Sequence, residues 1–446
     1  MAPRTALLFI VLLGCKPDPS YIDPASVTAT VSDTIASVVT VAWVAPEVDA
    51  VSVEYGPDTA YGHVTPARAS TRPVHEVTVL GIPVASTWHY RVVVEVDGER
   101  FVGEDHTVTT GSPAEDVREV ETVLGDPDAV DGYALLGASG AGPPADVVIR
   151  NTDGEVVWYW HVDDGQVFHP QRALDGSGVL FNVDNQGDWS VRRVVHVSMD
   201  GTSVEETPTP MGHHDFVQVP GIRFAYIAAE VRDVGGEDVV GDAIVEILED
   251  GSTREVWNAF DAMDVRPHYG WEYPFYQEGR DWTHANGIAY DEAEDAYYLS
   301  LYWLHQVVKI DRATGETLWV LGGDDGDLQF VDDDGFGPQH APSIVDGELV
   351  LFDNRGGFDE DSRIVRYAID EAAGTAERVW SYSQAGLHAE VMGDGLPLDD
   401  GTVASTWGET GMVLVTDAAG EVLWGLDHEA PTVLGQVGWL PTLYLE

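Results

Sequence analysis

Five histidines in this chain recur at one phase relative to turn signals. They are His169, His214, His284, His340 and His388. Four of them stand six residues before an Asp-Gly or Pro-Gly pair, and His284 stands seven residues before Asp291. The intervening residues suit a short strand and each pair suits a hairpin turn. If these strands hold equivalent places in repeated units, the five imidazoles converge on one site.

A ring of imidazoles can serve two kinds of chemistry. Neutral ring nitrogens bind transition metals, and Asp215 and Glu390 are the nearby carboxylates that could complete such a site. The other chemistry makes one histidine the acceptor of a transferred anionic group, while its neighbours balance charge on the oxygens. A packing role for histidine, in which only some of the five do chemistry, also stays open.

The stretch from Asp281 to Gly323 shows what must position these histidines. Acidic or Gly-containing turns divide it into apolar runs rich in Val, Ile, Leu, Tyr and Trp, which predict consecutive antiparallel strands. The runs are Gly287–Tyr290, Tyr297–Tyr302, Gln306–Ile310 and Glu316–Leu321. Four strands in about 40 residues are typical of one propeller blade. His284 and Asn286 stand at its head, on the strand that we expect to be innermost.

A second repeat gives the number of such units. A turn followed by an apolar strand that contains Trp recurs five times, and a weaker copy without Trp lies at Ser198–Glu205. The five are Asn151–Trp158, Asp250–Trp257, Asp311–Trp319, Glu371–Trp380 and Asp417–Trp424. Six units predict a six-bladed β-propeller over residues 115–446.

A smaller domain is predicted before the propeller, over residues 25–112. Its short strand patterns, with turns about every ten residues, favour a β-sandwich. They are Val27–Val31, Val38–Val44, Ala50–Tyr55, His75–Leu80, Trp88–Val96 and Phe101–Thr109. Trp43 and the strand around Tyr90 resemble a fibronectin type III module. The predicted fold class is therefore all-β, a sandwich followed by a propeller.

The first 15 residues predict the compartment. An apolar run, Ala6–Leu13, is too short to span a bilayer as a stable helix, which favours a signal peptide. Leu12–Cys15 resembles the lipobox of bacterial lipoproteins, so Cys15 is the expected lipidation site, followed by a tether over residues 16–24. Lys16 follows the Cys, which favours anchoring in the outer membrane of the cell envelope. Cys15 is the single cysteine, so no internal disulfide is expected.

The charge balance excludes one class of partner. The 77 acidic and 22 basic residues give a net charge of -55, which would repel phosphate backbones, so no nucleic-acid partner is expected. A solubilised surface, suited to a salty habitat, is the main interpretation. Divalent cations in Asp-rich loops such as Asp324–Asp334 are the alternative. No loop has the full EF-hand spacing, so no metal is assigned.

Several segments together resemble the bacterial arylsulfate sulfotransferase family. They are His213–Gly221, Asp281–Gly287, Val307–Gly323, Phe336–Asn354 and Ser362–Tyr367. The resemblance covers roughly residues 161–427 and implies a six-bladed propeller. It also implies transfer of a sulfuryl group from an aryl sulfate to a phenolic acceptor, through a sulfated histidine and without a cofactor.

The family motifs assign roles to particular residues. His340 matches the histidine that is sulfated, and His284 with Asn286 matches the H-x-N pair that supports the sulfuryl oxygens. A further channel histidine matches His214, or His213 beside it, and the spacing to the turn favours His214. His169 and His388 are additional candidates from the repeat.

One departure from the family matters. Tyr302 stands where the family usually has an arginine, and Arg355, just after Phe-Asp-Asn, could substitute for it. Two other functions therefore stay open: a noncatalytic, surface-anchored propeller that binds a ligand or envelope partner, and a metal-dependent hydrolase or lyase that uses the histidine ring. The sequence does not indicate an oligomeric state.

Overall fold

The computed structural model describes most of the chain in two compact units. The described residues are 21–70, 72–112, 117–140, 142–185, 188–266, 276–355 and 360–444. Among these, residues 21–112 belong to one unit and residues 117–444 to the other. The predicted signal peptide, with Cys15, lies outside the described residues. Within the described ranges, no helix is long and apolar enough to cross a membrane.

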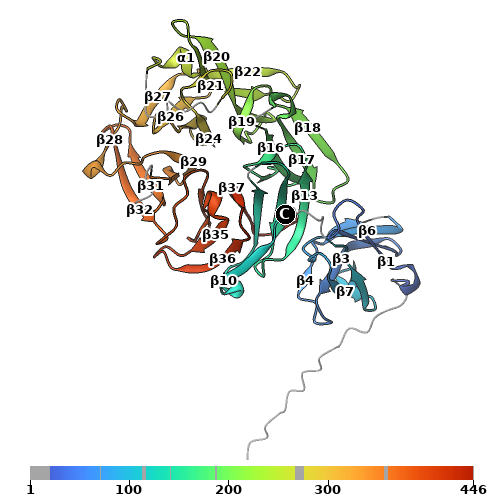
Figure 1. Cartoon of the computed structure of the whole chain (residues 1–446). Helices are drawn as coiled ribbons and strands as arrows, with labels where there is room; N and C mark the ends of the chain where they lie inside the picture. Colours follow the sequence, from blue (N-terminus) through green and yellow to red (C-terminus); the bar gives the residue numbers. More distant parts are fainter. Residues whose placement is uncertain are drawn as a thin grey trace, which may run out of the picture. The chain divides into compact units, whose positions relative to one another are not determined.

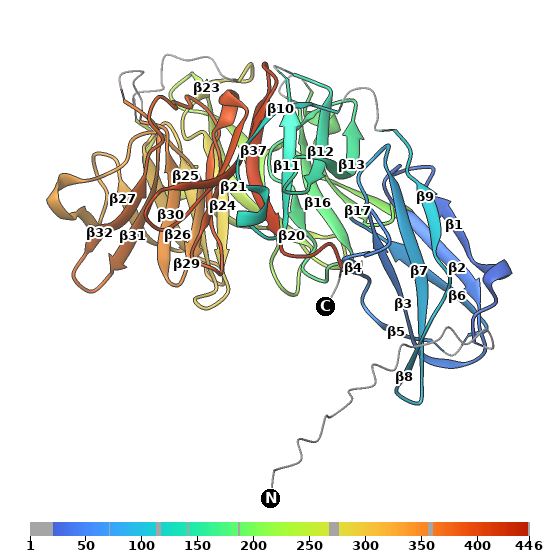
Figure 2. The same ribbon diagram turned by 90° about the horizontal axis from the view of Figure 1, so that it is seen from below.

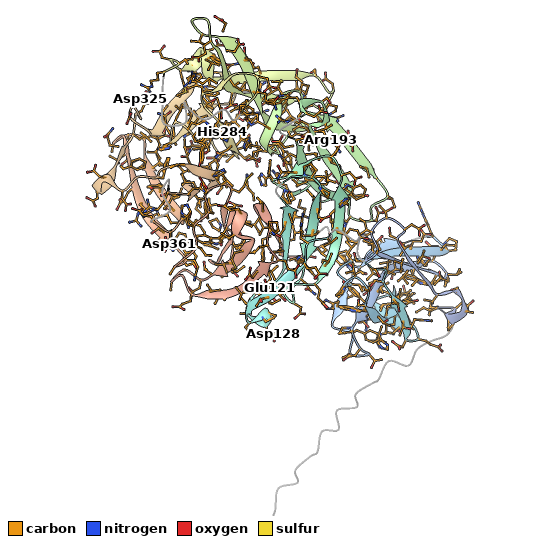
Figure 3. All side chains as sticks on the ribbon, in the orientation of Figure 1. Glu121, Asp128, Arg193, His284, Asp325 and Asp361 are labelled. Carbon is orange, nitrogen blue, oxygen red and sulfur yellow. The ribbon has the colours of Figure 1, made fainter. Side chains whose placement is uncertain are left out.

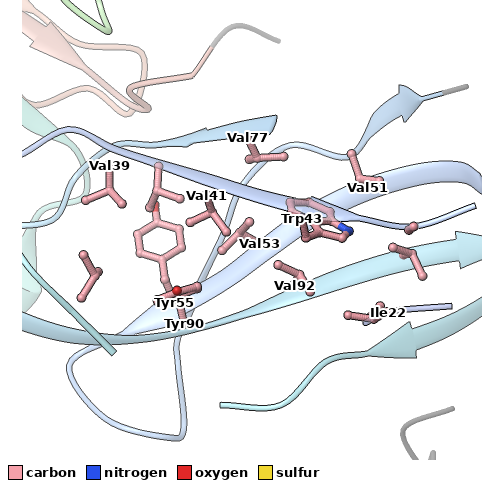
Figure 4. Close-up of a cluster of buried hydrophobic side chains, with 14 of the residues drawn as sticks. Ile22, Val39, Val41, Trp43, Val51, Val53, Tyr55, Val77, Tyr90 and Val92 are labelled. Atoms are coloured by element: carbon pink, nitrogen blue, oxygen red, sulfur yellow. The ribbon is translucent and has the colours of Figure 1, made fainter. Parts of the chain in front are cut away.

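The smaller unit contains two antiparallel sheets (Figure 1). The first is formed by β1 (Thr28–Val31), β2 (Val39–Val44) and β6 (Val74–Val79). The second is formed by β3 (Val48–Gly56), β4 (His63–Val64), β5 (Arg68–Ser70), β7 (Thr87–Val96), β8 (Glu99–Val102) and β9 (His106–Thr109). Alternate residues of both sheets bury their side chains in one core, where Trp43 packs with Val41, Val53 and Val92 (Figure 4).

One predicted strand of this unit is wrong. Phe101–Thr109 is divided into β8 and β9, which both pair with β7. The division falls at Gly103, whose N–H donates to the Val92 carbonyl at 2.9 Å. A Cβ at Gly103 would lie 2.9 Å from the Val92 side chain, so the backbone approaches β7 too closely for another residue and the strand bends there.

The larger unit is built from six sheets among the described residues, numbered here in chain order. Sheet 1 contains β11 (Tyr133–Ser139), β12 (Ala145–Arg150), β13 (Val156–Val162) and β37 (Val433–Leu440). Sheet 2 contains β14 (Gln166–Val167), β15 (Gln171–Arg172), β16 (Gly178–Asp184), β17 (Arg193–Ser198) and β18 (Val204–Pro208). Sheet 3 contains β19 (Gly212–Val217), β20 (Phe224–Asp233), β21 (Asp238–Ile247), β22 (Thr253–Asn258) and β23 (Arg280–Asp281).

The other three sheets follow in the same way. Sheet 4 contains β24 (Ala285–Asp291), β25 (Ala296–Leu301), β26 (Gln306–Asp311) and β27 (Thr317–Gly322). Sheet 5 contains β28 (Gln329–Phe330), β29 (Gln339–Val345), β30 (Glu348–Asp353), β31 (Arg363–Asp370) and β32 (Thr375–Tyr382). Sheet 6 contains β10 (Val120–Gly125), β33 (Asp394–Pro397), β34 (Val403–Thr406), β35 (Met412–Thr416) and β36 (Val422–His428).

Helical structure is confined to short turns. The described 3-10 turns are η1 (Pro24–Ser26), η2 (Pro127–Ala129), η3 (Trp189–Val191), η5 (Val331–Asp333) and η6 (Gly408–Thr410). One α-helical turn, α1 (Ala259–Ala262), follows β22. Helices therefore contribute little to the core, and the predicted all-β class is confirmed.

The sheets of the larger unit lie around a common centre, seen along its axis in Figure 1 and from below in Figure 2. The ends of the unit are interleaved: β10 pairs with β36 in sheet 6, and β37 pairs with β11 in sheet 1. The first strands of neighbouring sheets pack closely. A Cβ at Gly287 on β24 would lie 2.4 Å from Pro342 on β29, so only glycine fits at this contact. The predicted strands of sheet 4 are confirmed, in the order β24-β25-β26-β27.

The core of sheet 4 gives a direct test of this packing. Leu299 on β25 is fully buried, and Leu318 on β27 is 48% exposed. We expect Leu299→Ala to lower the free energy of unfolding by about 2 to 5 kcal/mol, because it leaves a cavity between sheets. Urea titration measures the loss, with Leu318→Ala as the matched control. Equal losses in the two variants would contradict the packing described here.

Candidate active site

Three histidines and one tyrosine form a continuous row at the centre of the larger unit. The ring centroids of His214 and His284 are 4.9 Å apart. The Tyr302 ring lies 5.6 Å from His284 and 5.2 Å from His340. Figure 3 marks His284 beside the centre of the ring of sheets. The structure therefore brings together His214 on β19, His284 just before β24 and His340 on β29, which the repeat phase predicted to converge.

A repeated backbone irregularity positions these side chains. His214 and His284 have positive φ angles of 55° and 49°, and Ala341, next to His340, has 48°. His214 lies within the register shift of β19 and Ala341 within that of β29, whereas His284 directly precedes β24, whose pairing shifts between Ala285 and Gly287. A non-glycine residue in the left-handed region costs of order 1 to 3 kcal/mol, and bulges redirect side chains near active sites. The bulges therefore turn the imidazoles toward the centre.

The protonation state of His340 follows from its hydrogen bonds. The Asn354 amide donates from Nδ2 to the carbonyls of Ala389 and Met392, both at 2.8 Å. Its Oδ1 must therefore accept from His340 Nδ1–H, at 2.7 Å. The lone pair then lies on His340 Nε2, which accepts a 3.2 Å hydrogen bond from the Met392 N–H.

Burial keeps this ring neutral. It lowers the pKa of His340 to about 4, and the nearby charge of His284 lowers it further against the favourable bond to Asn354. A neutral imidazole with its lone pair on Nε2 is the nucleophilic form of histidine. Asn354 ends the Phe336–Asn354 segment but was not among the predicted site residues.

His284 is held by a buried carboxylate. Its Nδ1 lies 2.6 Å from Asp281 Oδ2, which also accepts from Trp303 Nε1–H at 2.7 Å. Asp281 is 1% exposed. An acceptor on Nδ1 fixes the orientation of the His284 ring toward the other members of the row.

His213 and His214 are neighbours in sequence but have different partners. His213 Nε2 lies 2.9 Å from Asp242 Oδ1, and His213 Nδ1 lies 2.8 Å from His214 Nδ1. Burial and the charge of His284 hold the pKa of His214 well below its ordinary value. The sequence analysis missed Asp242, which comes from β21, far from the histidines in the sequence.

Asn286 joins two inner strands. Its Nδ2 donates to the Gln339 carbonyl at 2.7 Å, and its Oδ1 accepts from Ser300 Oγ at 2.7 Å. The residue therefore fixes β29 at the position just before His340. Its predicted contact with sulfuryl oxygens stays a prediction.

His169 belongs to a second polar group. Its Nδ1 lies 2.6 Å from Asp215 Oδ1. The second oxygen of this carboxylate, Oδ2, accepts hydrogen bonds from the Ile288 N–H and from Gln436 Nε2, both at 2.9 Å. Burial lowers the pKa of His169, but the Asp215 carboxylate outweighs it, so the pKa is raised. Burial also raises the pKa of Asp394, near this group, to about 6.

The expected equivalence of His388 is wrong. Asp394 and Gly395 lie inside β33 rather than in a hairpin turn, and the turn follows at residues 398–401. His388 therefore precedes the strand by a loop, with its Nδ1 2.9 Å from the Glu360 carbonyl. Counted back along the chain from this observed turn, Asp394 lies at about the position where the other sheets have a histidine.

The family arginine has no equivalent in the row. Tyr302 Oη donates to the Glu390 carbonyl at 3.3 Å. The Arg355 guanidinium pairs with Glu360 and lies 3.8 Å from Asp353 Oδ2. Arg355 would have to leave Glu360 to meet a substrate anion, and its role as a substitute stays a prediction.

A buried arginine, Arg192, holds the start of the strand that carries His213 and His214. Arg192 is 3% exposed and pairs with Asp184 at 2.9 Å. Its Nη1 donates to the Gly212 carbonyl at 2.9 Å, and its guanidinium stacks 3.6 Å from the centroid of Trp189. These contacts fix the start of β19 before the two histidines. Nothing in the local sequence distinguishes Arg192 from a surface arginine.

The ranges that the structure covers contain no group of three or more His, Cys, Asp or Glu residues arranged to hold a metal ion. Asp215 and Glu390, the carboxylates considered with the histidines, have other contacts. The Asp215 carboxylate bonds to His169, and at Glu390 it is the backbone that bonds, through its N–H to Glu409 Oε1 at 2.6 Å and through its carbonyl to Tyr302 Oη at 3.3 Å.

Comparison with known proteins identifies relatives. The family model described as Arylsulfotransferase (ASST) matches residues 143–391, more than half of the chain. The arylsulfate sulfotransferase AssT of Escherichia coli O6:H1 strain CFT073 is 24% identical over 347 residues, which are 58% of this chain and 57% of that protein. The chain thus spans little more than half the length of the curated relative that it matches.

Solved structures show weaker likeness. The periplasmic gluconolactonase PpgL of Pseudomonas aeruginosa has a TM-score of 0.43 and 13% identity, covering 70% of this chain and 99% of that one. A chain of a nidogen/laminin complex has a TM-score of 0.40 and 12% identity, covering 69% and 97%. Likeness at this level carries no argument about function.

The neutral state of His340 predicts a pH dependence of stability. In the unfolded chain its pKa is near the ordinary 6.5, so the unfolded state binds more protons between pH 6.5 and about 4. Stability therefore falls as pH falls through this window, by on the order of 3 kcal/mol for this residue. We expect His340→Asn to remove that part of the loss.

The measurement is the free energy of unfolding of both proteins between pH 4 and pH 7.5. His196→Asn, on β17 and bonded to Ser177 at 3.0 Å, is the control. Identical slopes for wild type and His340→Asn would show that His340 is not buried in its neutral form.

Proposed function

Because the chain belongs to the arylsulfotransferase family, we propose that it transfers a sulfuryl group from an aryl sulfate to a phenolic acceptor. The observation that carries this proposal is the state of His340, whose lone pair is directed to Nε2 by Asn354. A buried, neutral and oriented imidazole is the nucleophile that such a transfer needs.

The two half-reactions use the same groups. His340 Nε2 attacks sulfur, the N–S bond forms, and the S–O bond to the aryl group breaks, so that its electron pair stays on the phenol oxygen. That oxygen takes a proton from His214, whose ring lies in the row, with its centroid 4.9 Å from that of His284. An acceptor phenol then returns the proton to His214, its oxygen attacks sulfur, and the N–S bond breaks to restore His340. This sequence gives ping-pong kinetics.

Neighbouring groups support the transferred sulfuryl. His284 donates a hydrogen bond to its oxygens, since the ring lies in the row with its orientation fixed by Asp281. Asn286 acts by holding the strand that carries His340. Tyr302 supplies a hydroxyl without charge, and one lost charged donor costs roughly 3 kcal/mol of transition-state stabilisation.

A noncatalytic binding module is the second candidate function. The observations that favour it are the uncharged Tyr302 in the row and the pairing of Arg355 with Glu360. In that case the row of histidines binds an aromatic or anionic ligand without turnover.

We also infer the architecture behind this site. The six sheets of the larger unit act as blades of a six-bladed propeller over residues 115–446, and residues 25–112 form a fibronectin type III-like sandwich that serves as a spacer. The exchange of β10 and β37 between sheets 6 and 1 supports ring closure, because each end of the unit completes a sheet begun by the other end.

The proposed location is the cell envelope, with Cys15 lipidated and the protein held on the outer membrane. We expect the wild-type chain, expressed in a Gram-negative host, to fractionate with membranes, and Cys15→Ser to be released into the soluble fraction. Immunoblots of the fractions measure this. An unchanged membrane fraction in the variant would exclude the lipid anchor.

The nucleophile is tested with a donor whose phenol is coloured. We expect phenol release to rise when a second phenol is added, and His340→Asn to abolish this release, at least about a thousandfold, because covalent transfer has lost its acceptor. His196→Asn is the control with unchanged turnover. Release that persists in His340→Asn would exclude this histidine, and no release by the wild type with any donor would favour the binding module.

A further inference from the structure

We propose that Asp242 and His213 form a proton relay that sets the tautomer of His214 and stores its proton between the two half-reactions. Both are positioning residues, since they act on the phenol oxygen only through His214. The inference rests on the proposed sulfuryl transfer and assigns a role to a carboxylate on β21, outside the row of aromatic rings.

The contacts of Asp242 determine which ring nitrogen of His213 carries a hydrogen. The carboxylate is 1% exposed, and its Oδ2 accepts from Thr283 Oγ1–H and from the Ala285 N–H, both at 2.6 Å. Burial raises the pKa of Asp242, but His213 and these hydrogen bonds outweigh it, so the pKa stays below its ordinary value. An ionised carboxylate only accepts, so His213 Nε2, 2.9 Å from Oδ1, carries a hydrogen.

The contact between the two histidines then defines two states. In the neutral pair, the single proton of His213 is on Nε2, so its Nδ1 accepts from His214 Nδ1–H over 2.8 Å. The lone pair of His214 is then on Nε2, which makes it a base. When one proton is added, His213 carries both hydrogens, its Nδ1–H donates to His214, and His214 Nε2–H becomes an acid.

The added proton is better placed on His213 than on His214. Burial and the charge of His284 oppose a cation at His214. His213 Nε2 lies 2.9 Å from the buried Asp242 carboxylate, so a proton on the His213 ring lies next to a negative charge. In the proposed relay, the His213–His214 pair gives one proton to the leaving phenol oxygen and takes one back from the acceptor phenol.

Two isosteric substitutions interrupt the relay in different ways. In Asp242→Asn, the amide oxygen keeps the bonds from Thr283 and Ala285 and the NH₂ group faces His213 Nε2, so His213 must carry its proton on Nδ1. His214 then carries its hydrogen on Nε2, but once this proton is given away, His213 cannot supply another. In His213→Gln, the side-chain amide can still donate to Asp242, but it cannot take up a proton.

The test is single-turnover phenol release without acceptor, using 4-nitrophenyl sulfate and 4-methylphenyl sulfate. The nitrophenolate leaves without a proton, whereas the methylphenol needs one. We expect both variants to lose roughly a hundredfold or more with the methylphenyl donor and less than about threefold with the nitrophenyl donor. Asp146→Asn is the matched control, because Asp146 is a buried carboxylate 2.9 Å from His161 Nδ1 in sheet 1.

Each outcome decides the proposal. A donor-dependent loss in both variants, with the control unchanged, supports the relay. An equal loss with both donors would make Asp242 a structural residue, and no loss would make it dispensable; either result overturns the relay. If Asp242→Asn does not fold, judged by circular dichroism, His213→Gln decides alone. Wild type that releases neither phenol overturns the proposed transfer itself, and the relay with it.

Discussion

The site depends on buried polar side chains that bond across from one sheet to the next. Inner strands of neighbouring sheets do not share a hydrogen-bond ladder, so side chains supply the partners that buried backbone groups require. The bonds run from Asn182 to the His214 carbonyl, Asp215 to the Ile288 N–H, Asp242 to the Ala285 N–H, Asn286 to the Gln339 carbonyl and Asn354 to the Ala389 carbonyl. Some of the same groups also orient the histidines. The side-chain bonds that join neighbouring sheets therefore also set the tautomers of the histidines.

Much of this could be predicted from local patterns. The strands of sheet 4 were predicted almost residue by residue, because apolar runs alternate with acidic and glycine turns there. The convergence of His214, His284 and His340 followed from their similar distance to a turn, six or seven residues, since similar spacing in repeated sheets gives similar height along the axis. The same spacing argument gave a wrong prediction for His388, because Asp394 and Gly395 look like a turn in the sequence but begin β33.

The missing parts lie in contacts between distant segments. Asn354 fixes the His340 tautomer from the end of the next strand, and Asp242 reaches His213 over 29 positions. Arg192 stands behind the row because β17 follows a loop that returns to the start of β19. No periodicity marks such residues, since their partners are chosen by the way sheets pack. The left-handed angles at His214 and His284 likewise could not be predicted from the local sequence.

The central claim is that His340 carries the sulfuryl group between donor and acceptor. The most direct measurement is mass spectrometry of the protein after incubation with an aryl sulfate and no acceptor, followed by digestion at alkaline pH to protect an N–S bond. The account predicts one added sulfuryl group, located on His340 and lost when a phenol is added. Phenol release with an unmodified His340, or with the group on another residue, would contradict it.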